Sequence, residues 1–196
     1  MIREQPLHLF LLLTDREQLY DNLECPWTPW VDVCVLLHLV RRYRPARFLE
    51  IGTHRGHTTR ILADRFPEMS ITTVDPGDQV PSSERPAIQC AEYLPQSQIG
   101  ELVGGRHNVT ILKQPFQEID FGGEAFEMIF IDGNHFLPHV LDDSLLALRL
   151  LASFGVVVWH DYNHIGDVNL ALDQLPIRDR IVSLAGTWTA FYDSHL

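Results

Sequence analysis

The sequence predicts an α/β domain built on a doubly wound, mostly parallel sheet with an antiparallel C-terminal hairpin strand. Apolar, β-branched runs alternate along the chain with segments whose apolar residues recur at helical spacing. This alternation is typical of parallel strands joined by crossover helices. The last two strand-like runs are separated only by a short turn at Ala185-Gly186, which favours a hairpin. The chain has 196 residues, a length that suits one domain.

The first half of the chain is expected to form two helix–strand pairs. Residues 31–43 carry apolar side chains at helical spacing, and Pro45 ends the helix. A short apolar run then leads into Gly52, and a β-branched run ends at Asp75 before a Pro-Gly breaker. The expected order is helix, strand, helix and strand, over residues 31–43, 47–51, 58–66 and 70–74.

The second half continues the alternation after a less regular stretch. Residues 79–105 are expected to form a loop, one helix near 87–93 and a frayed second piece. The runs at 126–131 and 155–159 are apolar and continuous, as in parallel strands covered on both faces. The expected set is strands over 108–112, 126–131 and 155–159, helices over 137–151 and 168–175, and hairpin strands over 180–184 and 187–192.

Composition excludes several classes of partner. The formal net charge is −11 with the histidines neutral. Phosphate backbones and anionic lipid would be repelled, so we expect no nucleic-acid partner and no membrane partner. The apolar run over residues 7–13 is too short to span a bilayer. Cys25, Cys34 and Cys90 show no C-x-x-C spacing, which fits a reducing, cytoplasmic location.

The first expected strand is followed by a turn of unusual composition. Glu50 ends the strand, and Gly52 and Gly56 border the turn in a G-x-x-x-G spacing. Glycine lets the backbone turn sharply and approach a ligand closely. Asp75 follows the next strand, and a carboxylate in that place can accept hydrogen bonds from both hydroxyls of a ribose. The pair of features predicts a nucleoside-type ligand.

Two further polar segments follow the fourth and fifth strands. They read Ile131-Asp132-Gly133-Asn134-His135 and His160-Asp161-Tyr162-Asn163. The carboxyl ends of parallel strands lie at one edge of a sheet, so we expect these side chains to converge. Oxygen-rich ligands suit Mg²⁺ or Mn²⁺, whereas a larger share of imidazole would suit Fe, Zn or Ni.

Taken together, these segments resemble the class I S-adenosylmethionine-dependent methyltransferases. Within that class they are similar to the small-molecule O-methyltransferase branch that includes macrocin-type sugar O-methyltransferases. That branch shows I-D-G-x-H after its fourth strand and H-D-Y or D-D after its fifth. The resemblance covers roughly residues 46–162. It implies a Rossmann-like methyltransferase domain over 46–196, with residues 1–45 as an N-terminal helical cap segment of the same domain.

The resemblance also implies roles for single residues. The cofactor S-adenosylmethionine would be bound by Glu50, Gly52, Thr53, Gly56, Asp75, Gln114 (or Phe116 nearby) and Asp132. Glu50 would either order the turn or contact the amino group of the cofactor, and Gln114 would contact the adenine. Catalysis would rest on Asp132, Asp161 and His135, with His135 as general base, and Mg²⁺ would be held by Asp132, Asp161 and Asn163. Metal-dependent relatives usually carry Asp or Asn directly after the second metal acid, where this chain has Tyr162. Either Asn163 or His160 takes that place, or the site holds no metal.

The resulting hypothesis is a metal-assisted O-methyltransferase for a small hydroxylated molecule, such as a sugar or a secondary metabolite. Residues 1–45 and 79–105 would cover the substrate, and a homodimer is a further expectation. One alternative is a module that binds the cofactor without turnover. Another is a nicotinamide-dependent oxidoreductase, which the missing G-x-G-x-x-G and Tyr-x-x-x-Lys patterns disfavour. A metal-dependent oxygenase is a third.

Overall fold

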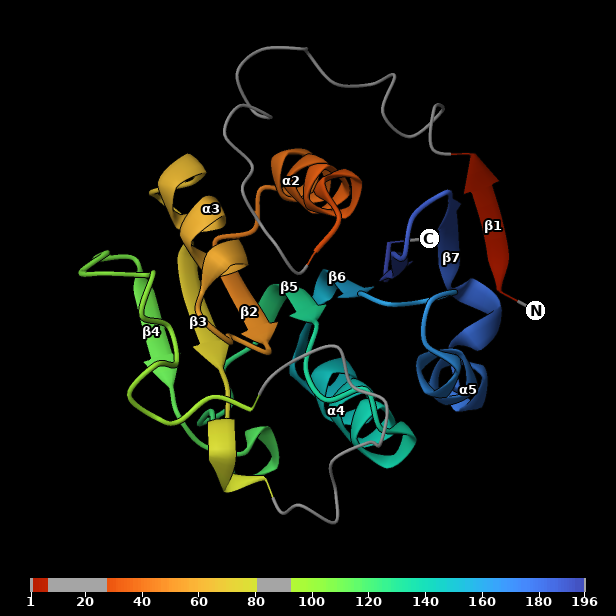
Figure 1. Ribbon diagram of the computed structural model, residues 1–196. Coiled ribbons are helices and arrows are strands. Elements are labelled where there is room, and N and C mark those ends of the chain that lie inside the picture. Colours follow the sequence, from red (N-terminus) through yellow and green to blue (C-terminus); the bar gives the residue numbers. More distant parts are fainter. Residues whose placement is uncertain (1, 7–27, 81–92, 196) are drawn as a thin grey trace.

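One mixed sheet crosses the molecule, and helices cover both of its faces (Figure 1). The computed structural model describes residues 2–6, 28–80 and 93–195. Within these residues the sheet has eight strands in the order β1-β7-β8-β6-β5-β2-β3-β4. The strands are β1 (Arg3–Pro6), β2 (Arg47–Ile51), β3 (Ser70–Val74), β4 (Val109–Leu112), β5 (Phe126–Ile131), β6 (Leu151–Trp159), β7 (Val182–Ala185) and β8 (Ala190–Asp193). The helices are α2 (Trp30–Tyr43), α3 (His57–Arg65), α4 (Leu137–Leu150) and α5 (Gly166–Gln174), and the short 3-10 turns are η1 (Gly77–Gln79), η3 (Phe116–Glu118) and η4 (Arg178–Arg180).

Side-chain alternation along the central strands divides the core into two layers. Phe48 and Met128 belong to the layer that packs against α2 and α3, and Leu49 and Ile129 belong to the layer that packs against α4 and α5. Figure 1 shows α2 and α3 above the sheet and α4 and α5 below it. Because both faces are covered, the central strands are apolar along their length. No helix in the described ranges has both the length and the apolar character that crossing a membrane requires.

Strand β2 lies at the point where the order of strands reverses. It pairs in parallel with β3 on one side and with β5 on the other, and Ile51 is in register with both Val74 and Ile131. The chain builds outward from β2 to β4 and then returns to the other side of β2 at β5. Ligands of open α/β sheets bind beyond the carboxyl ends of the strands at such a switch point.

The predicted fold class is confirmed. Strand β8 pairs antiparallel with β7 and β6, and the other pairings are parallel. Strand β6 begins at Leu151 rather than at residue 155. The prediction missed its first residues because they are partly exposed and lack the apolar pattern of the buried part. The hairpin strands β7 and β8 begin two and three residues later than expected. The helix expected near 87–93 lies almost wholly outside the described residues, and residues 93–105 form turns and irregular chain.

Strand β1 lies within residues 1–45, the expected helical cap segment, where no strand was predicted. Residues Arg3–Pro6 pair in parallel with Val182–Ala185 and form one edge of the sheet. Their side chains are mostly exposed, so the segment lacks the apolar pattern that marks buried strands. Pairing with a strand far along the chain decides its conformation. The part of the cap prediction over residues 7–27 lies outside the described residues, and the boundary at residue 46 stays a prediction.

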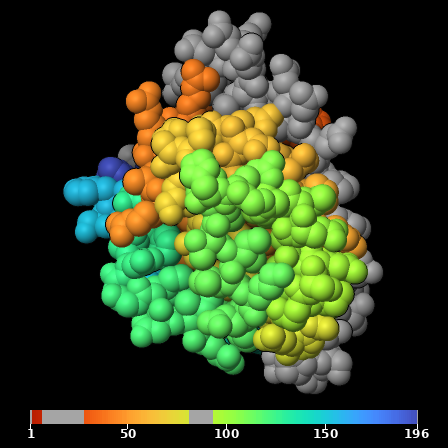
Figure 2. Space-filling view, turned by 90° about the vertical axis from the view of Figure 1, so that its left-hand side faces the viewer, coloured from red at the N-terminus to blue at the C-terminus, as the bar shows by residue number. Residues whose placement is uncertain are grey.

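The segment of residues 93–108 packs on the β4 side of the molecule. Figure 2 faces this side and shows the green part of the chain filling it next to α3, coloured gold. Arg106 forms an ion pair with Asp64 of α3 at 2.7 Å. The backbone N–H of Gly100 donates to the carbonyl of His54 at 2.7 Å. The segment therefore supports the turn that follows β2.

Replacing Phe48 by alanine tests the packed core. The side chain is fully buried, so Phe48→Ala is expected to lower the free energy of unfolding by about 3–5 kcal/mol. The control Phe154→Ala removes a ring that is 69% exposed and should change the free energy of unfolding by less than about 0.5 kcal/mol. Urea unfolding followed by circular dichroism measures both values. Equal losses in the two variants would contradict the assignment of the core.

Candidate active site

The turns after four strands meet at one edge of the sheet because the backbone hydrogen bonding continues one residue past each strand end. The N–H groups of Gly52, Asp75, Asp132 and His160 donate to the last carbonyls of neighbouring strands, those of Val74, Leu112, Ile51 and Ile131, at 2.8, 3.0, 2.8 and 3.0 Å. These bonds fix the position, along the strand direction, at which each turn leaves the sheet. The candidate site is built on this edge.

Gly52 cannot carry a side chain in this turn. Its φ is +105°, and a Cβ would lie 2.0 Å from the carbonyl oxygen of Asp132. Gly56 caps the start of α3 with a φ of +85°, and a Cβ there would lie 2.5 Å from Val103 Cγ2. Both glycines therefore allow close backbone approaches, between the β2 and β5 turns and between α3 and the segment of residues 93–108.

Glu50 stabilises the turn from beneath and does not line the pocket. Its side chain is buried, and Thr59 of α3 and Thr73 of β3 both donate hydroxyl hydrogen bonds to its Oε2, that from Thr73 at 2.6 Å. Thr53 extends the network, because its hydroxyl lies 2.6 Å from that of Thr73. Burial raises the pKa of Glu50 to about 7, against the hydrogen bonds from Thr59 and Thr73, which lower it. Of the two roles that the sequence allowed, ordering the turn is the one with observed contacts.

Asp75 faces a cavity at the end of β3. Its Oδ2 accepts the backbone N–H of His54 at 2.6 Å, and its Oδ1 accepts that of Gly77 at 2.7 Å. A carboxylate has about four lone-pair positions, so each oxygen can accept a further hydrogen bond. The backbone contacts therefore fix the carboxylate without exhausting its capacity for a ligand.

The cavity has a volume of about 510 Å³, within the range for small-molecule sites. Gly52, Asp75 and Asp132 line it, together with Ile51, His54, Val74, Pro76, Gln79, Val80, Tyr93, Leu94, Pro115, Phe116, Gln117, Glu118, Gly133, Asn134, His139, Asp142 and Asp143. Gln114, expected at its adenine end, is exposed and is not among the lining residues. Phe116 and Gln117 stand at the wall instead, since η3 turns the chain back after β4.

Asp143 of α4 is a buried acid at this wall. The side-chain amide of Gln117 donates to its Oδ1. Burial raises the pKa of Asp143 to about 7, against the hydrogen bond from Gln117. The contact with Gln117 depends on the packing of η3 against α4.

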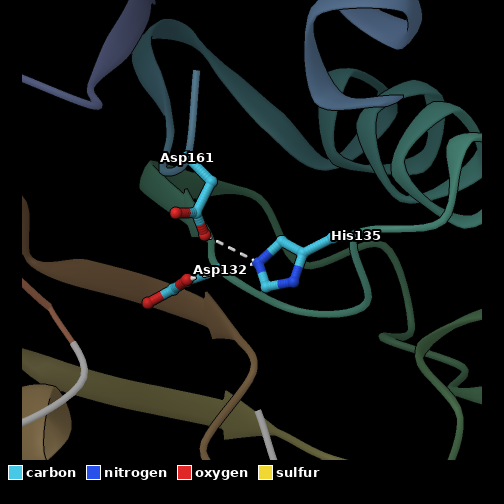
Figure 3. Close-up of side chains that lie close together, drawn as sticks. All are labelled: Asp132, His135 and Asp161. Atoms are coloured by element: carbon cyan, nitrogen blue, oxygen red, sulfur yellow. Dashed lines mark ion pairs between the residues drawn. The ribbon is translucent and has the colours of Figure 1, made fainter. Parts of the chain in front are cut away.

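Asp132, His135 and Asp161 form a compact cluster next to the cavity (Figure 3). His135 Nε2 lies 2.7 Å from Asp161 Oδ2 and 4.0 Å from Asp132 Oδ1. One potential ligand atom from each residue lies within 4.8 Å of the others. The convergence predicted for these three residues is confirmed by their positions. Asp132 belongs to both the cluster and the cavity wall.

His160 brings a second imidazole to the same carboxylates. Its Nδ1 lies 3.1 Å from Asp161 Oδ2 and 3.3 Å from Asp132 Oδ1. Burial lowers the pKa of His160, but the two carboxylates outweigh that effect and hold the pKa well above its ordinary value. For Asp161 the effects have the opposite signs. Burial raises its pKa, but the contacts with His135 and His160 outweigh burial and hold the pKa below its usual range.

The backbone after β6 separates the residues that follow Asp161. Asp161 adopts a left-handed conformation with a φ of 59°, and its carbonyl accepts the N–H groups of His164 and Ile165. Asn163, expected as a metal ligand, is exposed, and its backbone N–H donates to Asn169 Oδ1 at 2.8 Å. Tyr162 packs against the α4 and α5 layer of the core. Tyr162, which directly follows Asp161, is therefore part of the core packing.

Asp32 of α2 is a residue near the site that the sequence interpretation did not single out. Its carboxylate is buried, and its Oδ1 accepts hydrogen bonds from the Trp188 N–H at 2.9 Å and the Thr189 hydroxyl at 2.7 Å. It therefore ties α2 to the C-terminal hairpin. An acid inside the otherwise apolar helical run of α2 was the available signal.

Replacing Gly52 tests the close approach of the two turns. Gly52→Ala is expected to lower the free energy of unfolding by more than about 2 kcal/mol, because the new methyl group meets backbone atoms in a conformation unsuited to alanine. Gly166→Ala is the matched control, since a Cβ there has no neighbour within 4 Å. Thermal and urea unfolding measure both variants. Unchanged stability in Gly52→Ala would mean that the two turns are farther apart than described.

Sequence comparison identifies a family. The profile of the family described as a methyltransferase domain matches residues 49–162, which is more than half of the chain. No curated protein matches the chain in sequence.

Solved structures with the same fold include three methyltransferases. The O-methyltransferase TomG from Streptomyces achromogenes, involved in tomaymycin synthesis and solved with SAM, is 18% identical, with 94% of this chain and 92% of that chain covered and a TM-score of 0.57. An O-methyltransferase from Bacillus cereus, solved with SAH, is 16% identical, with coverage of 94% and 93% and a TM-score of 0.52. The SAH-bound methyltransferase PaMTH1 from Podospora anserina is 14% identical, with coverage of 84% and 77% and a TM-score of 0.55.

The matched residues 49–162 run from β2 through the turn after β6, and so contain every strand end that carries the site. The sheet order, the glycine turn and the acid after β3 agree with this assignment. The chain therefore belongs to the methyltransferase domain family, and it is a class I methyltransferase.

Proposed function

We propose that this methyltransferase transfers the methyl group of S-adenosylmethionine to a hydroxyl oxygen of a small molecule. The observation that carries the proposal is the position of Asp132, which lines the 510 Å³ cavity and also belongs to the cluster with His135 and Asp161. A cofactor in the cavity and an acceptor at the cluster would thus be neighbours. The SAM and SAH complexes of the structural neighbours support this choice of cofactor.

The cavity would offer polar groups to the ribose and an apolar wall to the base of a nucleoside. Asp75 would accept hydrogen bonds from the ribose hydroxyls through the lone pairs that His54 and Gly77 leave available. Gly52 would allow the methionine part of the cofactor to approach the backbone. Phe116, which is buried, would offer an apolar wall to the adenine in place of the predicted Gln114.

His135 is proposed as the general base. Its Nε2 lies 2.7 Å from Asp161, and the imidazole would take the hydroxyl proton as the acceptor oxygen attacks the methyl carbon and the carbon–sulfur bond breaks. S-adenosylhomocysteine is the leaving product. The two carboxylates would stabilise the imidazolium that results. Methyl transfer is an in-line displacement, so positioning the two reactants would supply much of the rate.

Asp132 and Asp161 are proposed to hold a divalent cation, with Mg²⁺ as the expectation from oxygen ligands. The residues fit such an ion, because the potential ligand atoms of Asp132, His135 and Asp161 gather within 4.8 Å of one another. A bound cation would lower the pKa of the acceptor hydroxyl and orient it. The exposed Asn163 is not carried forward as a ligand.

The acceptor is proposed to be a small hydroxylated molecule, a sugar or a secondary metabolite. TomG, which is involved in tomaymycin synthesis, gives a precedent for the second class on the same fold. A cytoplasmic location, a homodimer and a substrate cover from residues 1–45 and 79–105 remain predictions. Tyr93 and Leu94 fit the cover, since they line the cavity.

Binding of S-adenosylhomocysteine tests the cofactor assignment. Asp75→Ala is expected to weaken the affinity at least about tenfold, because it removes the acceptor for the ribose hydroxyls. Isothermal titration calorimetry measures the affinity, with Asp78→Asn, an exposed acid in η1, as the matched control and NAD⁺ as the control ligand. Binding of NAD⁺ in place of S-adenosylhomocysteine by the wild-type protein would overturn the proposal.

Replacing His135 tests turnover separately from binding. His135→Gln is expected to slow methyl transfer by about 10²–10⁴-fold while the affinity for S-adenosylhomocysteine stays within about twofold. The assay follows S-adenosylhomocysteine release over a panel of phenols, sugars and hydroxy acids, with the exposed His107→Gln as control. A wild-type protein that binds the cofactor and methylates no acceptor would favour the non-catalytic binding module.

A further inference from the structure

His160 is held with its imidazole edge against the two carboxylates of the cluster. It follows the buried strand β6, and its side chain packs beside Phe130 and Trp188, with ring centroids 6.3 and 6.0 Å away. Only 5% of the residue is exposed. The packing leaves the ring little freedom, so the direction of Nδ1 towards Asp132 and Asp161 is a property of the fold.

The contacts of Nδ1 with the two carboxylates have the spacing of a ligand shell. Nδ1 lies 3.1 and 3.3 Å from the two carboxylate oxygens. Neither His160 ring nitrogen has a hydrogen-bond partner among the described residues. Ligands about 2.0–2.2 Å from a shared cation are separated from their neighbours by about 3–3.5 Å. The two distances from the nitrogen to the carboxylate oxygens are therefore those expected between ligands of one ion.

Asp32 is a buried carboxylate close enough to His160 for the charges of the two side chains to act on each other. Its Oδ2 has no hydrogen-bond partner among the described residues, although only 3% of Asp32 is exposed. Burial raises the pKa of the Asp32 carboxyl, and its bond with Thr189 and the nearby His160 act to lower it. The Nε2–H of His160 is thus a buried donor without an acceptor, near a buried acceptor without a donor. Carboxylates commonly orient metal-binding histidines through the second ring nitrogen.

We propose that His160 binds the cation of this site through Nδ1, together with Asp132 and Asp161, and that the site therefore takes a first-row transition-metal dication in preference to Mg²⁺. Imidazole is a ligand suited to Zn²⁺, Fe²⁺ and their neighbours, whereas Mg²⁺ favours oxygen ligands. Asn163 is exposed and Tyr162 packs against the α4 and α5 layer, whereas His160 Nδ1 lies 3.3 and 3.1 Å from carboxylate oxygens of Asp132 and Asp161. The inference rests on the proposed cation at Asp132 and Asp161.

Metal binding to the full-length protein, without a histidine tag and after treatment with chelator, tests the proposal. Calorimetric titration with Co²⁺ alone and Mg²⁺ alone is expected to show Co²⁺ bound at least about tenfold more tightly by the wild-type protein. His160→Gln should weaken Co²⁺ binding by at least about tenfold and bring the two affinities closer. Asp32→Asn should weaken Co²⁺ binding less, since it removes only the support of the ring.

Pulsed electron paramagnetic resonance of bound Mn²⁺ identifies the ligand directly. We expect ¹⁴N modulation from imidazole in the wild-type protein, retained in His135→Gln and lost in His160→Gln. Loss in His135→Gln with retention in His160→Gln would overturn the assignment of His160. Equal Co²⁺ and Mg²⁺ affinities without a ¹⁴N signal, or no metal binding by the wild-type protein, would overturn the proposal as a whole.

Titration of S-adenosylhomocysteine into the same variants separates this inference from the proposed function. Unchanged affinity in His160→Gln shows that the variant is folded and that the cavity is intact. Cofactor binding and methyl transfer by a metal-free wild-type protein would refute the metal inference and leave the methyltransferase function standing. Absence of cofactor binding would refute the proposed function whatever the metal result.

Discussion

The site depends on the parallel register of β2, β3, β5 and β6 at the switch point. The hydrogen bonds that continue past the strand ends hold Gly52, Asp75, Asp132 and His160 at one level of the sheet. A shift of one residue would turn side chains to the opposite face of the sheet and break this arrangement. The close approach of Gly52 to the Asp132 carbonyl shows how little room the arrangement leaves.

The buried acids at this edge experience two different environments. Glu50 and Asp143 accept hydrogen bonds from neutral side chains, and burial raises the pKa of each to about 7. Asp161 is equally enclosed but faces two imidazoles, which hold its pKa below the usual range. The first environment suits a structural role, and the second keeps negative charge where an acceptor, a proton or a cation can use it. The chain thus places its negative charge at the cluster rather than beneath the turn.

Local pattern was sufficient for the central fold and for most of the site. The apolar runs at β2, β5 and β6 and the polar residues that follow them predicted the edge where Asp132, His135 and Asp161 meet. Local pattern failed where contacts between residues far apart in the chain decide the structure. Strand β1 is polar and forms only by pairing with β7, and η3 moves the cavity wall from Gln114 to Phe116 and Gln117.

The sequence by itself determined which residue types follow each strand. Glycine follows β2, acids follow β3, β5 and β6, and a histidine lies near the acid in each of the last two turns. The periodicity of strands and helices is local, so these placements follow from neighbouring residues. Only the tertiary structure decided which side chains after Asp161 reach the cluster. The left-handed backbone at Asp161 leaves Asn163 exposed, and the packing of α2 on the sheet brings Asp32 close to His160. Such contacts join residues far apart in the chain, and no local pattern specifies them.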